Sequence, residues 1–369
     1  MDTEEVLQGM DSRQSHHSSE GSSSPLGDGP NPAPPRSIIP SDVPSTVAIT
    51  VPNRPALPAL TRPPRTVQEL LARIQEFAEK TFQATSYALE VVSDGTVEEQ
   101  NATDNSSTRA FFDLVTQRIY VDKDTMQSLA ILVDYLAHTD AYDTSDPMHR
   151  TLIKELNEAV SVIFHEFIHS LGPKRAPLIE RDWERYQDQF SAAIESLSEG
   201  TTQLAAYAYL PKLIRALRLP ACDPLFSKAI PKPYVYIAQL YGVRELLRAC
   251  APLVGSSYDK ELCIFVRLGG STQAIEDLIT RILKHEGLME LPFNEATLAF
   301  TQLRRALLPP FKLAADLDRQ DLSRSLVESI MGSAVTKQMD TVRSLLTAKR
   351  ELLVKLSSPE TSPPGQELG

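Results

Sequence analysis

Residues 162–172 read VIFHEFIHSLG, and this stretch decides the fold and the chemistry that we expect. It contains the pattern HExxH, formed by His165, Glu166 and His169. In an α-helix, residues four apart lie on the same face, so both imidazoles can reach one metal ion. Glu166 lies beside them and can act as a general base without binding the metal. The stretch therefore predicts a helix that carries a metal site.

The residues around the motif predict that this helix is mostly buried. Apolar residues recur at helical spacing over residues 148–171, and Gly172 followed by Pro173 ends the predicted helix. The histidines and the glutamate could instead be polar groups of the core that bind no metal. Burying all three in that way would need several hydrogen-bond partners, and this cost favours the metal site.

A catalytic zinc site needs a third protein ligand and an open position. The longer pattern HExxHxxGxxH is absent, because position 175 is Arg. The third ligand is therefore expected to be a carboxylate of the next predicted helix, at about 180–210. The candidates there are Glu180, Asp182, Glu184, Asp188, Glu195 and Glu199.

Among these carboxylates, Glu199 is favoured over Glu195 because of its setting in SEGTTQ, residues 198–203. Gly200 lets another backbone approach closely beside the ligand. Gln203, one turn further along, can hydrogen-bond the ligand region. We therefore expect His165, His169 and Glu199 to be the metal ligands.

The pair HEFIHSLG and SEGTTQLAA resembles the gluzincin clan of zinc metallopeptidases, over roughly residues 110–250. The resemblance implies a zincin-like fold, Zn²⁺ bound by His165, His169 and Glu199, and Glu166 as the general base. It also implies that an edge strand at 114–121 holds an extended peptide substrate. Gln203 departs from the acidic residue that clan members often carry at its position.

The resemblance also points to a tyrosine that stabilises the oxyanion. Tyr236 precedes a predicted helix, as such a tyrosine does in some clan members, and we take it as the candidate. A tyrosine in a helix is more often a core residue, and three other tyrosines lie in the same region. These are Tyr234, Tyr241 and Tyr258.

The pattern of elements predicts an α+β fold that is mostly α. The sequence from Thr66 to Glu69 has the form of a capping box and opens the first helix. Residues 87–92 and 111–121 have the composition of strands, separated by a polar stretch at 93–109. Further helices are expected at 124–138, 148–171, 180–210, 234–253, 258–268, 271–286, 293–307, 318–331 and 335–356.

Composition divides the 369 residues into a folded block and two tails. Residues 1–65 hold 12 of the 27 prolines and no aromatic residue, so they are expected to be disordered. Residues 357–369 are similar. Between them we expect a zincin-like domain at 66–256, with a small sheet and the active-site helix, and a helical region at 257–356 packed on it.

Net charge and hydropathy indicate which classes of binding partner the protein is expected to have. The net charge of −11 disfavours nucleic acid. The most apolar stretch, 129–137, falls far short of the roughly 20 residues that span a membrane. The N-terminus MDTEEV has no signal-peptide character, and three cysteines fit a reducing compartment. These features predict a cytoplasmic protein. They leave open both export by a route other than Sec and the oligomeric state.

The sequence thus predicts a zinc-dependent metallopeptidase that acts on peptides or proteins. Two alternatives stay open. One is a zincin-like scaffold that binds zinc without catalysis. The other is a helical interaction protein that uses the amphipathic helix at 335–356 and binds no zinc.

Overall fold

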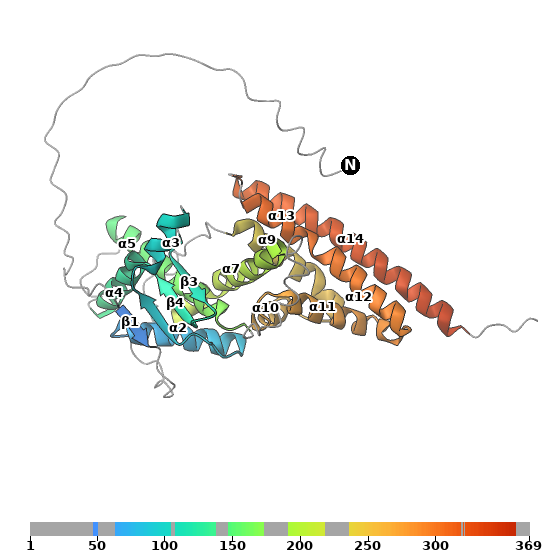
Figure 1. The fold of residues 1–369 in the computed structure, drawn as a ribbon, viewed down its shortest axis with the longest axis horizontal. Coiled ribbons are helices and arrows are strands. Elements are labelled where there is room, and N and C mark those ends of the chain that lie inside the picture. The colour runs from blue at the N-terminus through green and yellow to red at the C-terminus, as the bar shows by residue number, and fades with distance from the viewer. Residues whose placement is uncertain are drawn as a thin grey trace, which may run out of the picture. The chain divides into compact units, whose positions relative to one another are not determined.

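The structure is a computed structural model, and it describes residues 47–50, 63–104, 108–137, 147–172, 191–217, 236–318, 320 and 322–358. All of these residues belong to one compact unit that spans residues 44–369. Helices dominate this unit and a small sheet accompanies them, which confirms an α+β fold that is mostly α (Figure 1). Both regions predicted within 66–356 lie in the same unit.

The sheet has four short strands in the order β1-β2-β4-β3. They are β1 (Val47–Thr50), β2 (Glu90–Ser93), β3 (Ala110–Asp113) and β4 (Arg118–Val121). β2 pairs in parallel with β4, whereas β1–β2 and β3–β4 are antiparallel pairs. β3 is therefore an edge strand, and β4 is an interior one.

The prediction of one strand over 111–121, with an edge strand at 114–121, was wrong. The chain turns back between β3 and β4 through Gln117, whose φ is 57°. Asp113 supports the turn, because its carboxylate accepts hydrogen bonds from the Val115 N–H and the Thr116 hydroxyl, both at 2.8 Å. The residues 118–121 then lie between two other strands, and the edge consists of residues 110–113.

Three further elements lie where none was predicted, namely β1, α3 and, in the C-terminal part, α13 (Pro309–Asp318). β1 falls inside the predicted disordered tail and pairs with β2, Val47 opposite Ser93. The segment VAIT is rich in β-branched residues, and it can add to an existing sheet edge without a core of its own. The polar stretch at 93–109 contains helix α3 (Thr96–Asp104). Of the predicted tails, residues 63–65 and 357–358 are also described, and residues 1–46, 51–62 and 359–369 lie outside the described residues.

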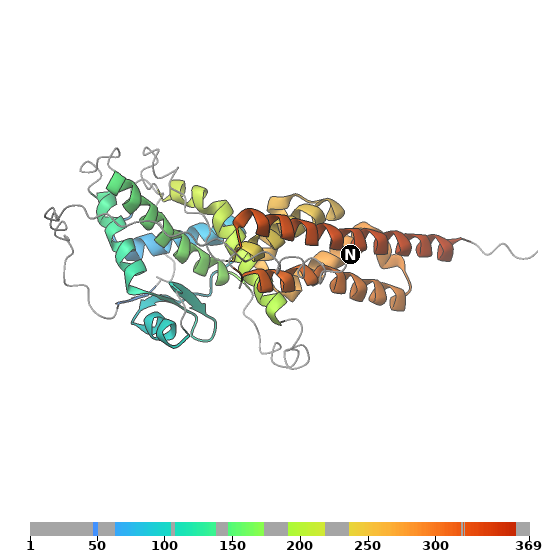
Figure 2. The same cartoon turned by 90° about the horizontal axis from the view of Figure 1, so that it is seen from above.

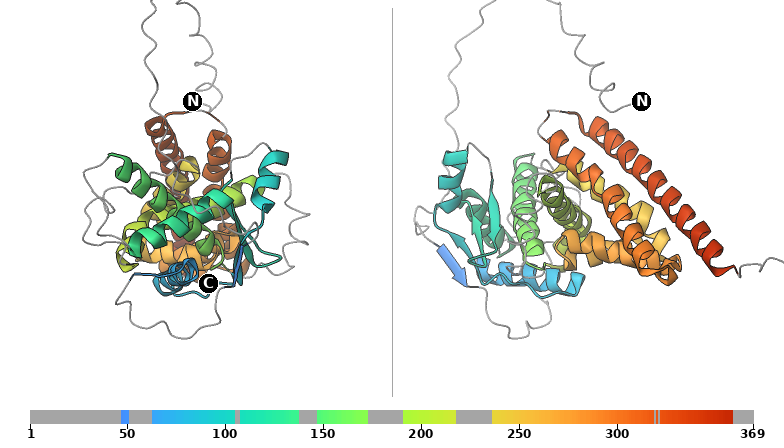
Figure 3. Two further views of the ribbon diagram at one scale, coloured as in Figure 1. Left: turned by 90° about the vertical axis from the view of Figure 1, so that its left-hand side faces the viewer. Right: turned by 45° about the vertical axis from the view of Figure 1, so that its right-hand side comes forward.

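The helix with the HExxH motif belongs to a group of five large helices. They are α2 (Val67–Phe82), α4 (Lys123–Ala137), α5 (Pro147–His169), α7 (Ser191–Ala216) and α9 (Ile237–Cys250). Thr66 caps α2 as predicted, since its hydroxyl accepts the Glu69 N–H at 3.1 Å. α5 contacts α2, α4, α7 and β3, so it lies in the middle of this group (Figure 3).

The C-terminal part of the described chain is helical throughout. Its α-helices are α10 (Tyr258–Arg267), α11 (Thr272–His285), α12 (Phe293–Leu307), α13 (Pro309–Asp318) and α14 (Arg324–Ser357), with short 3₁₀ helices η2 (Pro252–Val254) and η3 (Leu288–Glu290). The two helices predicted at 318–331 and 335–356 merge into one continuous helix, α14, which begins only at Arg324 and packs along α12 (Figure 2). Residue 318 is instead the last residue of α13. Gly332 does not interrupt it, because the apolar face buried on both sides offsets the glycine cost of about 1 kcal/mol.

The buried hydrophobic residues form one cluster that joins both predicted regions. Val335, Met339, Val342 and Leu346 are part of it, so the apolar face of the predicted C-terminal helix packs within the chain itself. Cys250 of α9 lies in the same cluster, with its Sγ 3.7 Å from Sδ of Met339.

A pair of charged side chains also connects two of the helices. The buried carboxylate of Glu261 in α10 accepts two hydrogen bonds from the Arg281 guanidinium in α11, at 2.7 and 2.8 Å.

Among the helices of the described ranges, none is both long and apolar enough to cross a bilayer.

Candidate metal centre

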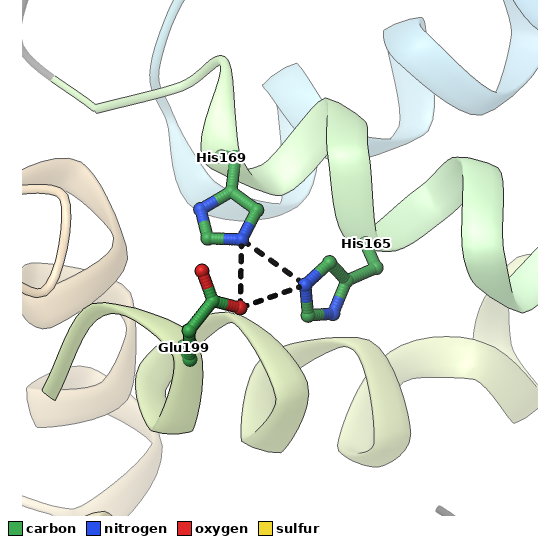
Figure 4. A group of neighbouring side chains, drawn as sticks. All are labelled: His165, His169 and Glu199. Carbon is green, nitrogen blue, oxygen red and sulfur yellow. Dashed lines mark hydrogen bonds and ion pairs between the residues drawn. The ribbon is translucent and has the colours of Figure 1, made fainter. Parts of the chain in front are cut away.

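The three predicted metal ligands come together between α5 and α7. His165 and His169 project from the C-terminal end of α5, one turn apart, and Glu199 projects toward them from α7 (Figure 4). Nε2 of His165 lies 3.0 Å from Nε2 of His169. Oε2 of Glu199 lies 3.4 Å from the first of these nitrogens and 3.3 Å from the second.

This triangle of ligand atoms has the size that a zinc ion requires. Zinc binds imidazole nitrogen and carboxylate oxygen at about 2.0–2.2 Å in a tetrahedron, which separates neighbouring ligand atoms by about 3.3–3.6 Å. The three observed separations, 3.0, 3.3 and 3.4 Å, lie close to this range. Within the described residues, these three form the one His, Cys, Asp and Glu group that could hold a metal ion.

The other predicted carboxylates do not join the cluster. Glu195 is exposed on α7, one turn before Glu199. Glu180, Asp182, Glu184 and Asp188 lie outside the described residues. The prediction that Gly200 permits a close backbone approach is confirmed, because a Cβ atom there would lie 2.5 Å from the backbone oxygen of Gln239.

A hydroxyl group contacts one of the two imidazoles from behind. Oγ1 of Thr202, a buried residue, lies 3.3 Å from Nδ1 of His169. When Nε2 of an imidazole binds a metal, Nδ1 carries the hydrogen, so His169 would donate this bond to the threonine oxygen. The structure gives this position to Thr202, the neighbour of the predicted Gln203. Nδ1 of His165 is buried and has no hydrogen-bond partner among the described residues.

Glu166 lies beside the ligands without being one of them. Its side chain is buried, and the backbone of Phe112, on edge strand β3, lies close enough to act on its charge. Burial raises the pKa of Glu166 to about 8, and the negative charge of Glu199 adds to this, although His165 and the Phe112 N–H act in the opposite direction. Sequence patterns gave no sign of Phe112, because a backbone contact leaves no residue signature.

Glu199 has the opposite electrostatic balance. Burial alone would raise its pKa, but the charge of His169 and the hydrogen bonds of both imidazoles outweigh burial. Together they hold the pKa of Glu199 well below its usual range, so this carboxylate stays ionised. An ionised carboxylate beside two imidazole nitrogens is a ligand set that suits a divalent cation.

Tyr236 is also at the site. Its ring stacks on that of His165, with centroids 6.2 Å apart and planes 15° apart. Burial and the charges of Glu199 and Glu166 raise the pKa of its phenol, so Tyr236 keeps its hydrogen at neutral pH. The residue has a left-handed backbone, φ 56°, which costs about 1–3 kcal/mol in a non-glycine residue and is typical of functional sites.

The other tyrosines are elsewhere or not described. The hydroxyl of Tyr241 accepts a hydrogen bond from Arg324 of α14 at 2.7 Å. Tyr258 opens α10, and Tyr234 lies outside the described residues.

Comparison of the chain with family models, with curated proteins and with solved structures found no match in any of the three.

Proposed function

We propose that the protein is a zinc-dependent metallopeptidase of zincin-like type, with His165, His169 and Glu199 as ligands. The observation that carries the proposal is that the ligand atoms of these three residues form one triangle with sides of 3.0–3.4 Å. Glu199 reaches this triangle although it lies 30 positions after His169 in the sequence. The buried Glu166 beside this triangle supplies the one further group that peptide hydrolysis needs.

A bound zinc ion would supply Lewis-acid polarisation of the scissile carbonyl group and acidify water. Glu166 would act as the general base, taking a proton from the attacking water and giving it to the leaving amine. Burial raises the pKa of Glu166 in the metal-free site, and the positive charge of a bound zinc ion would lower it again, so that the carboxylate could accept the proton.

The neighbouring strand supports a peptide as the substrate. β3 is an edge strand, so the backbone groups on its outer side take no part in the sheet. An extended peptide can add to such an edge through main-chain hydrogen bonds. Because Phe112 of this strand contacts Glu166, a peptide paired there would pass next to the general base.

Tyr236 would serve as a hydrogen-bond donor to the oxyanion. Its phenol keeps its hydrogen at neutral pH, and its ring lies against the ligand His165. A hydrogen-bond donor of this kind typically raises the catalytic rate by a factor of about 10²–10³.

The experiment that tests the proposal compares Glu166→Gln with the wild-type protein. We expect wild-type protein to bind one zinc ion and cleave peptides of a proteome-derived library, and Glu166→Gln to bind zinc and lose cleavage by at least about 10³-fold. Zinc is measured by atomic absorption and cleavage by mass spectrometry. Glu155→Gln, an exposed glutamate of the same helix α5, is the matched control and should keep full activity. Wild-type activity in Glu166→Gln would exclude Glu166 as the base.

A second candidate is a zinc-binding scaffold without catalysis. The low exposure of the site favours it, since His165 is 8% and Glu166 7% exposed. This candidate predicts one zinc ion per chain and no cleavage of any library peptide by the wild-type protein. If the protein bound neither zinc nor cobalt, the remaining hypothesis would be the helical interaction protein.

A further inference from the structure

We infer that the turn between α10 and α11 is part of the metal centre, and that Gly270 of this turn and Gly200 of α7 are positioning residues for Glu199. The inference rests on the proposed zinc site. It assigns a role in that site to a segment of the C-terminal helical region that is more than 65 residues away in sequence from each of the three ligands.

Gly200 fixes one side of the helical turn that carries Glu199. A Cβ atom on Gly200 would lie 2.5 Å from the backbone oxygen of Gln239 and 2.6 Å from its carbonyl carbon. Such distances are far below van der Waals contact, so α9 can lie against α7 here only because residue 200 is glycine. Gln239 is three residues beyond Tyr236, whose ring stacks on His165. The contact therefore sets α7 against the element that covers the ligand histidine.

Gly270 fixes another side of the same turn. Its φ is +54°, and a Cβ atom there would lie 2.8 Å from Cα of Ser198 and 2.9 Å from Cβ of Thr201. The hydroxyl of Ser198 also donates a hydrogen bond to the carbonyl oxygen of Gly269, at 3.3 Å. Ser198 and Thr201 flank Glu199, so the glycine turn lies against the backbone of one neighbour of the ligand and the side chain of the other.

The glycine turn also touches the helix that carries the histidines. A Cβ atom on Gly172, three residues after His169, would lie 3.0 Å from Cα of Gly269. The turn thus contacts both chain segments that provide ligands. Because metal ligands must be placed to within about 0.5 Å, an added methyl group that pushes α7 away would carry the Glu199 carboxylate out of position.

The test measures zinc affinity by competition with a chromogenic chelator, and records the visible absorption spectrum of the protein loaded with Co²⁺, which reports coordination geometry. The variants are Gly200→Ala and Gly270→Ala. The chain offers a matched control for each. Gly332 lies within a helix, as Gly200 does, and Gly287 has φ +69°, close to that of Gly270. At both control positions a Cβ atom meets nothing within 4 Å.

We expect Gly200→Ala and Gly270→Ala to weaken zinc binding about tenfold or more, the range for groups that orient metal ligands, and to change the cobalt spectrum. Gly332→Ala and Gly287→Ala should keep the wild-type affinity and spectrum, although the second carries the same backbone strain as Gly270→Ala. Wild-type affinity in both test variants, or an equal loss in their controls, would overturn the inference.

Two further measurements keep the outcome interpretable. Ser198→Ala removes the hydrogen bond to the turn without adding an atom, and it should weaken zinc binding several-fold even if Gly270→Ala does not fold. An unchanged affinity in folded Ser198→Ala would then contradict the role of the turn. If wild-type protein itself binds neither Zn²⁺ nor Co²⁺, the proposed metal centre fails, and this result differs from a failure of the glycine variants alone.

Discussion

Thr202 supports His169 with a neutral hydroxyl group, where a carboxylate would add a negative charge. A hydroxyl can fix the orientation and tautomer of the imidazole, but it raises the basicity of Nε2 less than a carboxylate would. The negative charge of the ligand set then comes from Glu199 alone. The electrostatics of the site therefore depend strongly on one side chain.

We predict that Thr202→Val weakens zinc binding by about tenfold, because it removes the acceptor for Nδ1–H of His169 while keeping the shape of the side chain. Isothermal titration with Zn²⁺ measures the change. Thr201→Val is the control, since the Thr201 hydroxyl is buried and has no hydrogen-bond partner among the described residues. A larger loss in Thr201→Val than in Thr202→Val would contradict this role.

The site residues show what sequence could and could not predict at this scale. His165, His169 and Glu199 follow from residue type and spacing, because metal ligands must have particular donor atoms. Gln203 was predicted to hydrogen-bond the ligand region, and the contact to His169 comes from its neighbour Thr202. Neighbouring residues of a helix point about 100° apart, and only the relative rotation of α5 and α7 decides which one faces the imidazole.

At the scale of elements, the predictions failed where local pattern and tertiary packing disagree. Alternating residues at 114–121 fit a strand, but Asp113 and the left-handed Gln117 make a turn that periodicity does not reveal. Gly332 and Ser333 suggest a helix end, but the buried face of α14 continues across them. By contrast, the Thr66 cap and the end of α5 near Gly172 were predictable, because backbone groups at helix ends need local partners.

The buried ion pair between α10 and α11 gives a prediction about these elements. Arg281→Met leaves the Glu261 carboxylate, which is 0% exposed, without its bidentate partner. We expect the free energy of unfolding to fall by about 3–5 kcal/mol. Urea denaturation followed by circular dichroism measures it.

Two variants serve as references for this measurement. The double variant Arg281→Met with Glu261→Leu should recover most of the loss, because it removes the unpaired charge as well. Arg343→Met, which breaks an exposed pair with Asp340, should change the free energy of unfolding by less than about 1 kcal/mol. Equal losses in Arg281→Met and Arg343→Met would show that the buried pair has no special role.

At the scale of the whole molecule, the metal ligands join helices that belong to one continuous core. A zinc ion that binds only the folded chain would stabilise all of it, by about 2.7 kcal/mol at a zinc concentration 100 times the Kd. Cys250 can report this stabilisation, because it lies in that core far along the chain from the ligands.

We predict that zinc slows the alkylation of Cys250 by iodoacetamide, by up to about 100-fold at that concentration. Burial raises the pKa of this thiol to about 12, so the folded protein presents almost no accessible thiolate at pH 8. Labelling therefore requires opening of the core. Mass spectrometry of the peptide that contains Cys250, with zinc and with a chelator, gives the two rates. In Glu199→Ala the two rates should coincide, and coincident rates in the wild-type protein would contradict the prediction.

The direction of α5 has an electrostatic consequence. His165 and His169 lie at the C-terminal end of α5, where the aligned peptide dipoles give a helix macrodipole its partial negative end. Cations near such an end are typically stabilised by about 0.3–1 kcal/mol, and by more in a partly buried setting. The backbone of α5 thus adds to the attraction that Glu199 exerts on a cation. Had the same two histidines stood in the first turn of a helix, the backbone would have opposed the ion that their side chains attract.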